Sequence, residues 1–338
     1  MSPSVPHLSR ILGSGVPPDA LAFFGRWWQL ETWLRELVYV ELRAKYGLGW
    51  TQHLQGSAPG RAAGDEANAY MASADSGELL AYADVSDLFR LIEDQWDLFA
   101  PFLSPQRRWL GTSDELRELR NRNAHCRRPH PDDLNRIEQT LRNLEQGAKR
   151  FYTSYLDTHG LDALGDPLAQ SWIAGEHPVA ERLLEHASRN YDVRFRLSYS
   201  VRPWATAPDE RSVSGSEGVL WHAHWMIAGR DLNVGELWAE VARPGLPRES
   251  VVHLLVHPGN VTATFAAVDD ARQIADEIGY TFDDILTTSH EHVAVGSADE
   301  WWNGWLHGAE LLPRRAQAAS PLTLIDPLRT DTFSIFSA

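Results

Sequence analysis

A short run in the first half of the chain combines side chains that phosphate chemistry requires. It reads Arg120-Asn121-Arg122-Asn123-Ala124-His125. Cleavage of RNA without a metal needs a base for the ribose 2′-hydroxyl, an acid for the leaving oxygen and a cation on the phosphate. Histidine titrates near neutral pH and suits both proton transfers, whereas arginine holds phosphate bidentately and keeps its charge. The run therefore indicates a site in which Arg120 stabilises phosphate, His125 transfers protons and the Asn121 amide orients one of them.

Further side chains in and next to this run form a small island with potential RNA contacts: Arg122, Asn123, Arg127 and Arg128. They can follow the phosphate backbone of RNA, or the arginines can reflect the preference for cations at the C-terminus of a helix. Five helical residues separate Arg120 from His125 by roughly 140°, so the two side chains are expected to flank one groove. Cys126 diverges from its neighbour His125 by about 100° on a helix, so a Cys–His dyad is not expected.

Four amphipathic helices are predicted to position this run. Apolar residues recur every three or four positions in residues 17–46, from Asp84 to before Pro105, from near Thr112 to about Arg127, and in residues 132–158. The second and third segments open with capping-box patterns. Residues 55–77 are rich in Gly, Ala and Ser and are expected to form a long loop. The pattern predicts an all-α, up-and-down four-helix bundle, with the run near the end of the third helix.

The run and its flanks resemble one family. Arg120-Asn121 followed by His125 matches the Arg-x4-6-His signature of HEPN (higher eukaryotes and prokaryotes nucleotide-binding) domains, including the Asn after the Arg. Residues 28–37 with 46–50 resemble the first helix of the Swt1-like and abortive-infection subgroups, and residues 88–99 resemble their second helix. The segment 116–119 leads into the signature as is common there. The resemblance covers about residues 15–155.

This resemblance implies a metal-independent endoribonuclease that acts as a homodimer without a cofactor, with the two Arg/His pairs at the shared interface. It implies that Arg120 stabilises the phosphorane, that His125 is the general acid or base, and that Asn121 orients. Such proteins often serve as toxins or anti-phage effectors, with an antitoxin or a regulatory partner. Subgroups silenced by nucleotidylation carry Tyr where Arg127 stands here, so that control is not expected. The alternative is an inactive HEPN module that binds nucleotide or RNA, or scaffolds a complex.

The second half of the chain has a different pattern. Residues 192–202 alternate between apolar and polar side chains, and 219–227, 251–257 and 261–268 are further predicted strands. Helices are predicted at 179–188, 271–278 and 298–312. The expected organisation is therefore a HEPN domain at 15–160, a linker at 161–176, and an α+β domain of sensor or regulatory type at 177–338.

Histidines and tryptophans in this half allow two interpretations each. Pairs of histidines share predicted strand faces: His222 with His224, His253 with His257, and His290 with His292. Imidazoles bind transition metals, but no carboxylate spacing completes a metal motif, so structural or exposed histidines are the favoured interpretation and no metal is assigned. Trp301, Trp302 and Trp305 could stack on bases, and a core or interface role is favoured for them.

Charge and cysteine content narrow the classes further. The net charge is −15, yet residues 101–150 hold 11 basic and 7 acidic side chains, so close phosphate contacts stay feasible at the run. A single cysteine excludes an intramolecular disulfide and a cysteine-based zinc site. The sequence shows neither a secretory signal pattern nor an apolar stretch of about 18 residues. A cytoplasmic protein without membrane association is expected.

Overall fold

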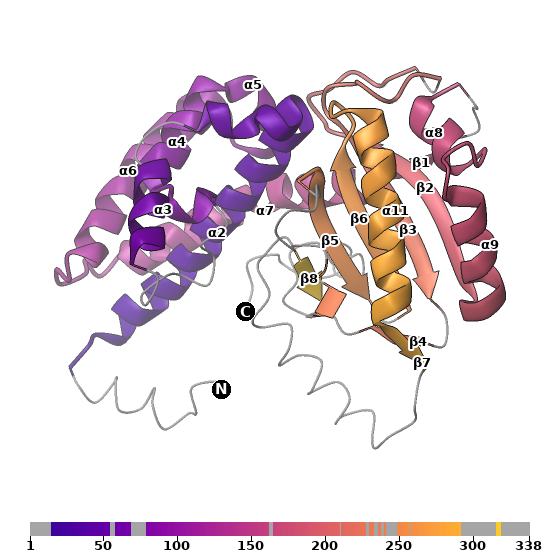
Figure 1. The fold of residues 1–338 in the computed structure, drawn as a ribbon. Coiled ribbons are helices and arrows are strands. Elements are labelled where there is room, and N and C mark those ends of the chain that lie inside the picture. The colour runs from indigo at the N-terminus through magenta and orange to yellow at the C-terminus, as the bar shows by residue number, and fades with distance from the viewer. Residues whose placement is uncertain are drawn as a thin grey trace. The chain divides into compact units, whose positions relative to one another are not determined.

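The structure is a computed structural model that describes residues 15–54, 58–68, 79–161, 165–209, 211–227, 230–232, 236–237, 240, 249–257, 259–291 and 316–318. These residues form two compact units, which Figure 1 shows as a helical part and a part built on a sheet. The first contains the described residues of 1–38 and 83–151, and the second those of 39–82 and 152–331. The predicted helix at 298–312 and the three tryptophans within it lie outside the described residues.

Helices make up the first unit. They are α2 (Pro18–Tyr46, whose last residues 39–46 belong to the second unit), α4 (Val85–Asp94), α5 (Trp96–Phe99), α6 (Gln106–Ala124) and α7 (Asp133–Leu156, whose end also belongs to the second unit). The apolar positions that predicted them are buried, among them Leu30, Leu88 and Leu144. The N-terminal half of the chain is therefore helical.

The helix boundaries agree with the predictions in part. The Asp84 side chain accepts the Asp87 backbone N–H at 3.0 Å, as the capping pattern at the start of α4 predicted. The second predicted helix is broken at Gln95, whose φ of −116° and ψ of 40° end α4 before α5 begins. The third helix begins at Gln106 instead of Thr112, because the Pro105 carbonyl already accepts the backbone N–H of Arg108 and Trp109. Proline fits just before a helix, since it has no N–H to leave unpaired.

A glycine allows α7 to approach the 3-10 helix η4 (Ala100–Phe102), which follows α5. A Cβ atom built on Gly147 would lie 1.7 Å from the backbone oxygen of Phe102 and 2.5 Å from its carbonyl carbon. The contact continues through the Phe102 and Phe151 rings, whose centroids are 5.7 Å apart in an edge-to-face arrangement. Main-chain atoms cannot move aside as a flexible side chain can. Only glycine therefore fits at position 147.

We expect Gly147→Ala to destabilise the helical unit, against the usual gain of up to about 1 kcal/mol for this change inside a helix. The added methyl group must push two backbone segments apart, which costs about 1–3 kcal/mol. Chemical denaturation followed by helical circular dichroism measures the difference. Gly111→Ala on α6 is the matched control, because its Cβ would meet no atom within 4 Å. A stability gain for both variants would contradict the close approach.

The segment after α2 is more regular than predicted. A 3-10 helix η1 (Gly47–His53) follows α2 directly, and α3 (Ala58–Ala67) occupies part of the region that was expected to be a long loop. The loop prediction is wrong for this part, since alanines at four positions of 58–67 support a helix despite two glycines. A further 3-10 helix, η3 (Leu79–Tyr82), precedes α4.

A mostly antiparallel sheet forms the centre of the second unit. Its described strands are ordered β1–β2–β3–β6–β5–β8, and only the β5–β8 pair is parallel. Their bounds are β1 Thr158–Gly160, β2 Val193–Val201, β3 Val219–Ile227, β5 Val251–His257, β6 Asn260–Ala266 and β8 Ala316–Ala318. The four predicted strands correspond to β2, β3, β5 and β6. The predicted C-terminal end of the fourth helix, residue 158, lies beyond the observed end of α7 at Leu156. The residues that follow form β1, in which Gly160 pairs with Ser198.

Three helices pack on one face of this sheet (Figure 1): α8 (Pro167–Trp172), α9 (Ala180–Tyr191) and α11 (Ala271–Thr288). Alternate strand residues such as Leu197, Trp225 and Phe265 form one hydrophobic core with Trp172 and Phe282 from these helices. The sequence did not predict α8, and it ended α11 ten residues too early. Two short strands, β4 (Arg230–Leu232) and β7 (Ser289–Glu291), pair beside the sheet and were not predicted either.

Helix α2 enters this unit through a buried ion pair. The guanidinium of Arg202 donates to both carboxylate oxygens of Glu41, with the shortest distance 2.6 Å, and both side chains are fully buried. The indole Nε1 of Trp204 donates to the same carboxylate at 2.6 Å. Burial raises the pKa of Glu41, and the Arg202 charge opposes this rise.

Among the helices that the structure describes, none has the length and apolar character to cross a membrane.

Candidate functional site

The predicted site residues gather at the C-terminal end of α6. Leu116 and Leu119 bury one side of this helix in the core. Arg120 follows on the border of that buried stripe and is half-exposed, whereas Asn121 is exposed. His125 caps the helix, with φ −93° and ψ 17°, and its backbone N–H still bonds the Asn121 carbonyl at 3.3 Å. The third predicted helix thus ends at Ala124, three residues earlier than expected.

The chain leaves α6 through a Schellman turn. Cys126 takes a left-handed conformation with φ 51° and donates its backbone N–H to Asn123 at 2.9 Å. The Arg127 N–H then reaches back to the carbonyl of Arg122 at 3.0 Å, which completes the motif. Glycine usually occupies the left-handed position. His125 is therefore the last residue before the chain reverses, and its exposed side chain stands at the tip of the helix.

Arg120 and His125 are available for chemistry. Neither side chain makes a hydrogen bond or ion pair with another part of the chain that the structure describes, and Arg120 is not buried. The exposed side chains of Arg127 and Arg128 follow the turn. Asn123 is half-buried on the same helical end.

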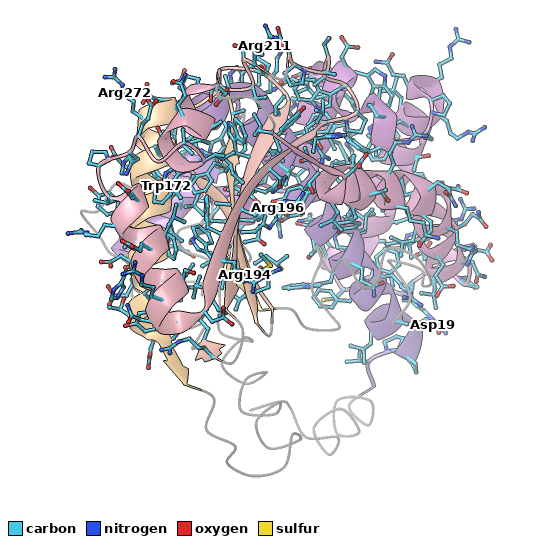
Figure 2. The ribbon with its side chains drawn as sticks, turned by 90° about the vertical axis from the view of Figure 1, so that its right-hand side faces the viewer. Asp19, Trp172, Arg194, Arg196, Arg211 and Arg272 are labelled. Carbon is cyan, nitrogen blue, oxygen red and sulfur yellow. The ribbon has the colours of Figure 1, made fainter. Side chains whose placement is uncertain are left out.

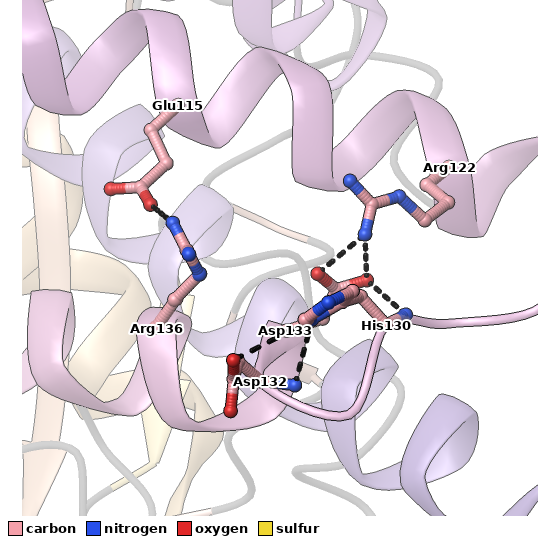
Figure 3. A network of polar contacts seen from close by, with 6 residues as sticks. All are labelled: Glu115, Arg122, His130, Asp132, Asp133 and Arg136. Atoms are coloured by element: carbon pink, nitrogen blue, oxygen red, sulfur yellow. Dashed lines mark hydrogen bonds and ion pairs between the residues drawn. The ribbon is translucent and has the colours of Figure 1, made fainter.

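Arg122 has a different environment, shown in Figure 3. One of its guanidinium nitrogens contacts both oxygens of Asp133, at 2.7 and 2.9 Å. The Asp133 side chain is only 6% exposed and also accepts the backbone N–H of His130 at 2.9 Å. Asp133 is the first residue of α7, so the bond connects the end of α6 to the start of the next helix. Arg122, one of the predicted RNA contacts, is therefore engaged in an ion pair within the protein. An Asp at a helix start was the signal that could have suggested it.

A second ion pair between the same helices provides a comparison within one structure. Arg136 of α7 pairs with Glu115 of α6, as Figure 3 also shows. Both side chains are strongly exposed, at 52% and 41%. Water competes for exposed charges and screens their attraction, so such pairs contribute little. The Arg122–Asp133 and Arg136–Glu115 pairs therefore connect the same two helices but differ in burial, so that a comparison of them isolates the effect of burial.

We expect a double-mutant cycle on Arg122→Ala and Asp133→Ala to give a coupling energy of about 2 kcal/mol, because Arg122→Ala leaves the nearly buried carboxylate without its charge partner. Free energies of unfolding from urea titrations supply the four corners of the cycle. The matched cycle on Arg136→Ala and Glu115→Ala should show no measurable coupling. Equal coupling in the two cycles would mean that burial of Asp133 does not strengthen its pair.

The N-terminal half thus contains a helical domain in which an arginine and a histidine at one helix end have no partner among the described residues. Residues 28–146 match the family model described as Swt1-like HEPN. The N-terminal half of the chain therefore carries a Swt1-like HEPN domain, and the resemblance read from the sequence is confirmed. This family association suggests a ribonuclease or nucleotide-binding role. No curated protein and no solved structure matches the chain.

The histidines of the second half take part in a hydrogen-bonded ladder across the sheet. His222 bonds Ser200 through Nε2 at 2.8 Å and Thr264 through Nδ1 at 3.0 Å. His224 in the same way bonds Ser198 at 2.8 Å and Thr262 at 2.9 Å. All four ring nitrogens are thus occupied by hydroxyl groups.

Tyr155 of α7 extends this ladder. Its hydroxyl donates to Thr264 at 2.8 Å and also contacts Nδ1 of His253 at the same distance. Within the described residues, no three histidine, cysteine or acidic side chains are grouped to hold a metal ion. The side chains of His257 and His290, and all of His292, lie outside the described residues. The Tyr155 hydroxyl therefore connects the end of α7 to the side chains of β5 and β6.

Burial keeps these imidazoles uncharged. The pKa of His222 lies well below its ordinary 6.5 because of burial, with repulsion from His224 and Arg202 adding to the effect. Burial and the charge of Arg196 lower the pKa of His224 to about 4. Both rings bind protons in the unfolded chain at a pH where the folded chain does not. Stability is therefore retained above pH 6.5 and lost as the pH falls from there toward 4.

We expect the sheet unit to lose stability between pH 6.5 and 5, at up to about 1.4 kcal/mol per pH unit for each histidine. Thermal melts at a series of pH values, followed by tryptophan fluorescence, measure this slope. The double variant His222→Gln/His224→Gln should flatten it, whatever its stability at pH 7. His186→Gln, at an exposed position on α9, serves as the control. A slope unchanged by the double variant would assign the pH dependence to other groups.

Proposed function

We propose that the chain is a metal-independent endoribonuclease whose active site contains Arg120, His125 and Asn121. The observation that carries the proposal is the environment of the first two. Arg120 has no carboxylate partner among the described residues, while Arg122, two positions away, is paired with Asp133. The guanidinium of Arg120 is therefore open to a phosphate from outside the protein, whereas that of Arg122 is already engaged. The free guanidinium and the exposed imidazole beside the Schellman turn are suited to an external phosphate.

The reaction follows from the two side chains. The ribose 2′-oxygen attacks the adjacent phosphorus and loses its proton to an imidazole, which acts as general base. Negative charge then grows on the non-bridging oxygens, where the guanidinium of Arg120 donates two hydrogen bonds. The bond from phosphorus to the 5′-oxygen breaks, and that oxygen takes a proton from a second imidazole. The products are a 2′,3′-cyclic phosphate and a 5′-hydroxyl end, and no metal or cofactor takes part.

A homodimer supplies the second imidazole in this proposal. Each protomer contributes one His125, so two copies that join near the ends of α6 provide a base and an acid. Arg127, Arg128 and Asn123 would hold the flanking RNA backbone. We further propose that α2, α4 with α5, α6 and α7 form an up-and-down four-helix bundle that presents this end to the partner. A cytoplasmic toxin or phage-defence effector, restrained by an antitoxin or regulatory partner, is the role that fits this activity.

We expect the purified chain to cleave labelled RNA, and His125→Ala to slow cleavage at least about 100-fold, the usual cost of losing a general acid–base group. Arg120→Lys should also lose most activity, because an ammonium cannot make two parallel bonds to a phosphate. Gel analysis of the fragments and of their cyclic phosphate ends measures both effects. EDTA should leave the rate unchanged.

Two control variants separate loss of chemistry from general loss of charge. Arg142→Ala and His186→Ala remove exposed side chains of the same types from other helices, and cleavage should persist in both. Intact RNA after incubation with the wild type, at concentrations where the chain is dimeric, would contradict the proposal. RNA or nucleotide binding without cleavage would then indicate an inactive HEPN module.

A further inference from the structure

The sheet has a second face, opposite α8, α9 and α11, and some of the described side chains on it are exposed. Toward one end of this face Tyr155 packs over His222 and His253. The strand register aligns two further rows beyond that end, and we call them the open rows. They consist of Arg196, His224 and Thr262 in one row, and Arg194, Met226 and Asn260 in the next.

Three positions of the open rows are exposed to solvent, and the two arginines among them have no charge partner within the described residues. Both arginines are exposed, and Met226 is 42% exposed although it lies in the middle of a sheet. Neither guanidinium forms an ion pair or hydrogen bond with the rest of the described chain. No row position is acidic, in a chain whose net charge is −15. Figure 2 shows the two arginines along one strand, with Arg211 and Arg272 at the other end of the unit.

The hydrogen bonds of His224 fix the direction of its ring. Nε2 points toward Ser198 on β2 and Nδ1 toward Thr262 on β6, so the ring plane runs across the strands. One ring face is directed at His222, at 6.1 Å between centroids and 29° between planes. The other face must therefore be directed along β3 toward Met226. The two hydrogen bonds thus fix the orientation of this ring face, and the neighbouring Met226 side chain is exposed.

We infer that the open rows bind single-stranded RNA, with phosphates on Arg194 and Arg196 and an unpaired base stacked on His224 over Met226. Two residues apart on a strand, the arginines have Cα atoms about 6.7 Å apart. That is close to the separation of consecutive phosphates in an extended nucleic acid strand. Aromatic rings, histidine included, are the usual stacking partners of unpaired RNA bases. An acidic peptide could pair with the arginines but would gain nothing from the ring.

This inference rests on the proposed function in that the bound strand would be the substrate, held at a surface separate from the Arg120 site. The two claims are testable apart, because binding can be measured without cleavage. A 2′-O-methylated oligonucleotide has no free 2′-hydroxyl to attack phosphorus. It therefore reports binding alone, for the full-length chain and every variant of it.

We expect Arg194→Gln/Arg196→Gln to weaken binding of a fluorescent 2′-O-methyl oligouridine about tenfold or more, as measured by anisotropy. The slope of log affinity against log salt should fall by about 1.4, the value for two lost phosphate contacts to a single strand. The matched control Arg211→Gln/Arg272→Gln removes the same charge from exposed positions elsewhere. It should change affinity by less than about twofold. His224→Ala should weaken binding of the single strand, and wild type should bind it more tightly than duplex RNA.

Each outcome decides one claim. Equal losses in the two arginine pairs, no loss in either, or no binding by the wild type would overturn the inference about the open rows. A preference for duplex RNA would overturn the stacking on His224. If unmodified RNA stays intact while Arg194→Gln/Arg196→Gln still reduces binding, the nuclease proposal fails and the RNA surface stands. If RNA is cleaved and Arg194→Gln/Arg196→Gln has no effect on binding, the inference about the open rows fails and the nuclease proposal stands.

Discussion

The buried ion pair between Glu41 and Arg202 is the constraint on which much of the structure depends. Both side chains are inaccessible to water, and their geometry is bidentate. A charge left alone at that depth costs several kcal/mol, so the last turns of α2 cannot shift against the end of β2 without a large penalty. Helix α2 contributes residues to both compact units. One helix thus belongs to both units, and residues 39–46 are its part of the second.

The repeating elements could be predicted from the sequence because burial leaves a periodic pattern. The alternation in 192–202 and the three-to-four spacing in 17–46 gave β2 and α2 nearly to the residue. Element boundaries that depend on single backbone hydrogen bonds or dihedral angles were harder to predict from the sequence. The α6 start at Gln106 depends on the Pro105 carbonyl, and the break at Gln95 on a local change of φ and ψ. Strand β1 has three residues and exists only through its partner, so no local pattern announces it.

The candidate site shows the same division between local and distant information. Arg120, Arg122 and His125 stand close together in the sequence and look alike in chemical type. Their separation into free and neutralised side chains depends on Asp133, eleven positions after Arg122. The sequence likewise paired His222 with His224 correctly on one strand face, yet it could not show that serines and threonines on two neighbouring strands occupy their ring nitrogens. Side-chain types indicated chemistry, and tertiary contacts decided which groups were available for it.

The left-handed Cys126 has a consequence for how the segment between α6 and α7 can vary. The turn there ends one helix, and only seven residues later Asp133 must reach back to Arg122 while it also receives the His130 N–H. Both ends of this short connection are thus anchored to the same helical end. The length of this connection is therefore fixed. Inserting or deleting one residue within it would displace Asp133 from its position opposite Arg122. The position of His125 at the tip of α6 is therefore tied to the length of this connection as well as to the helix itself.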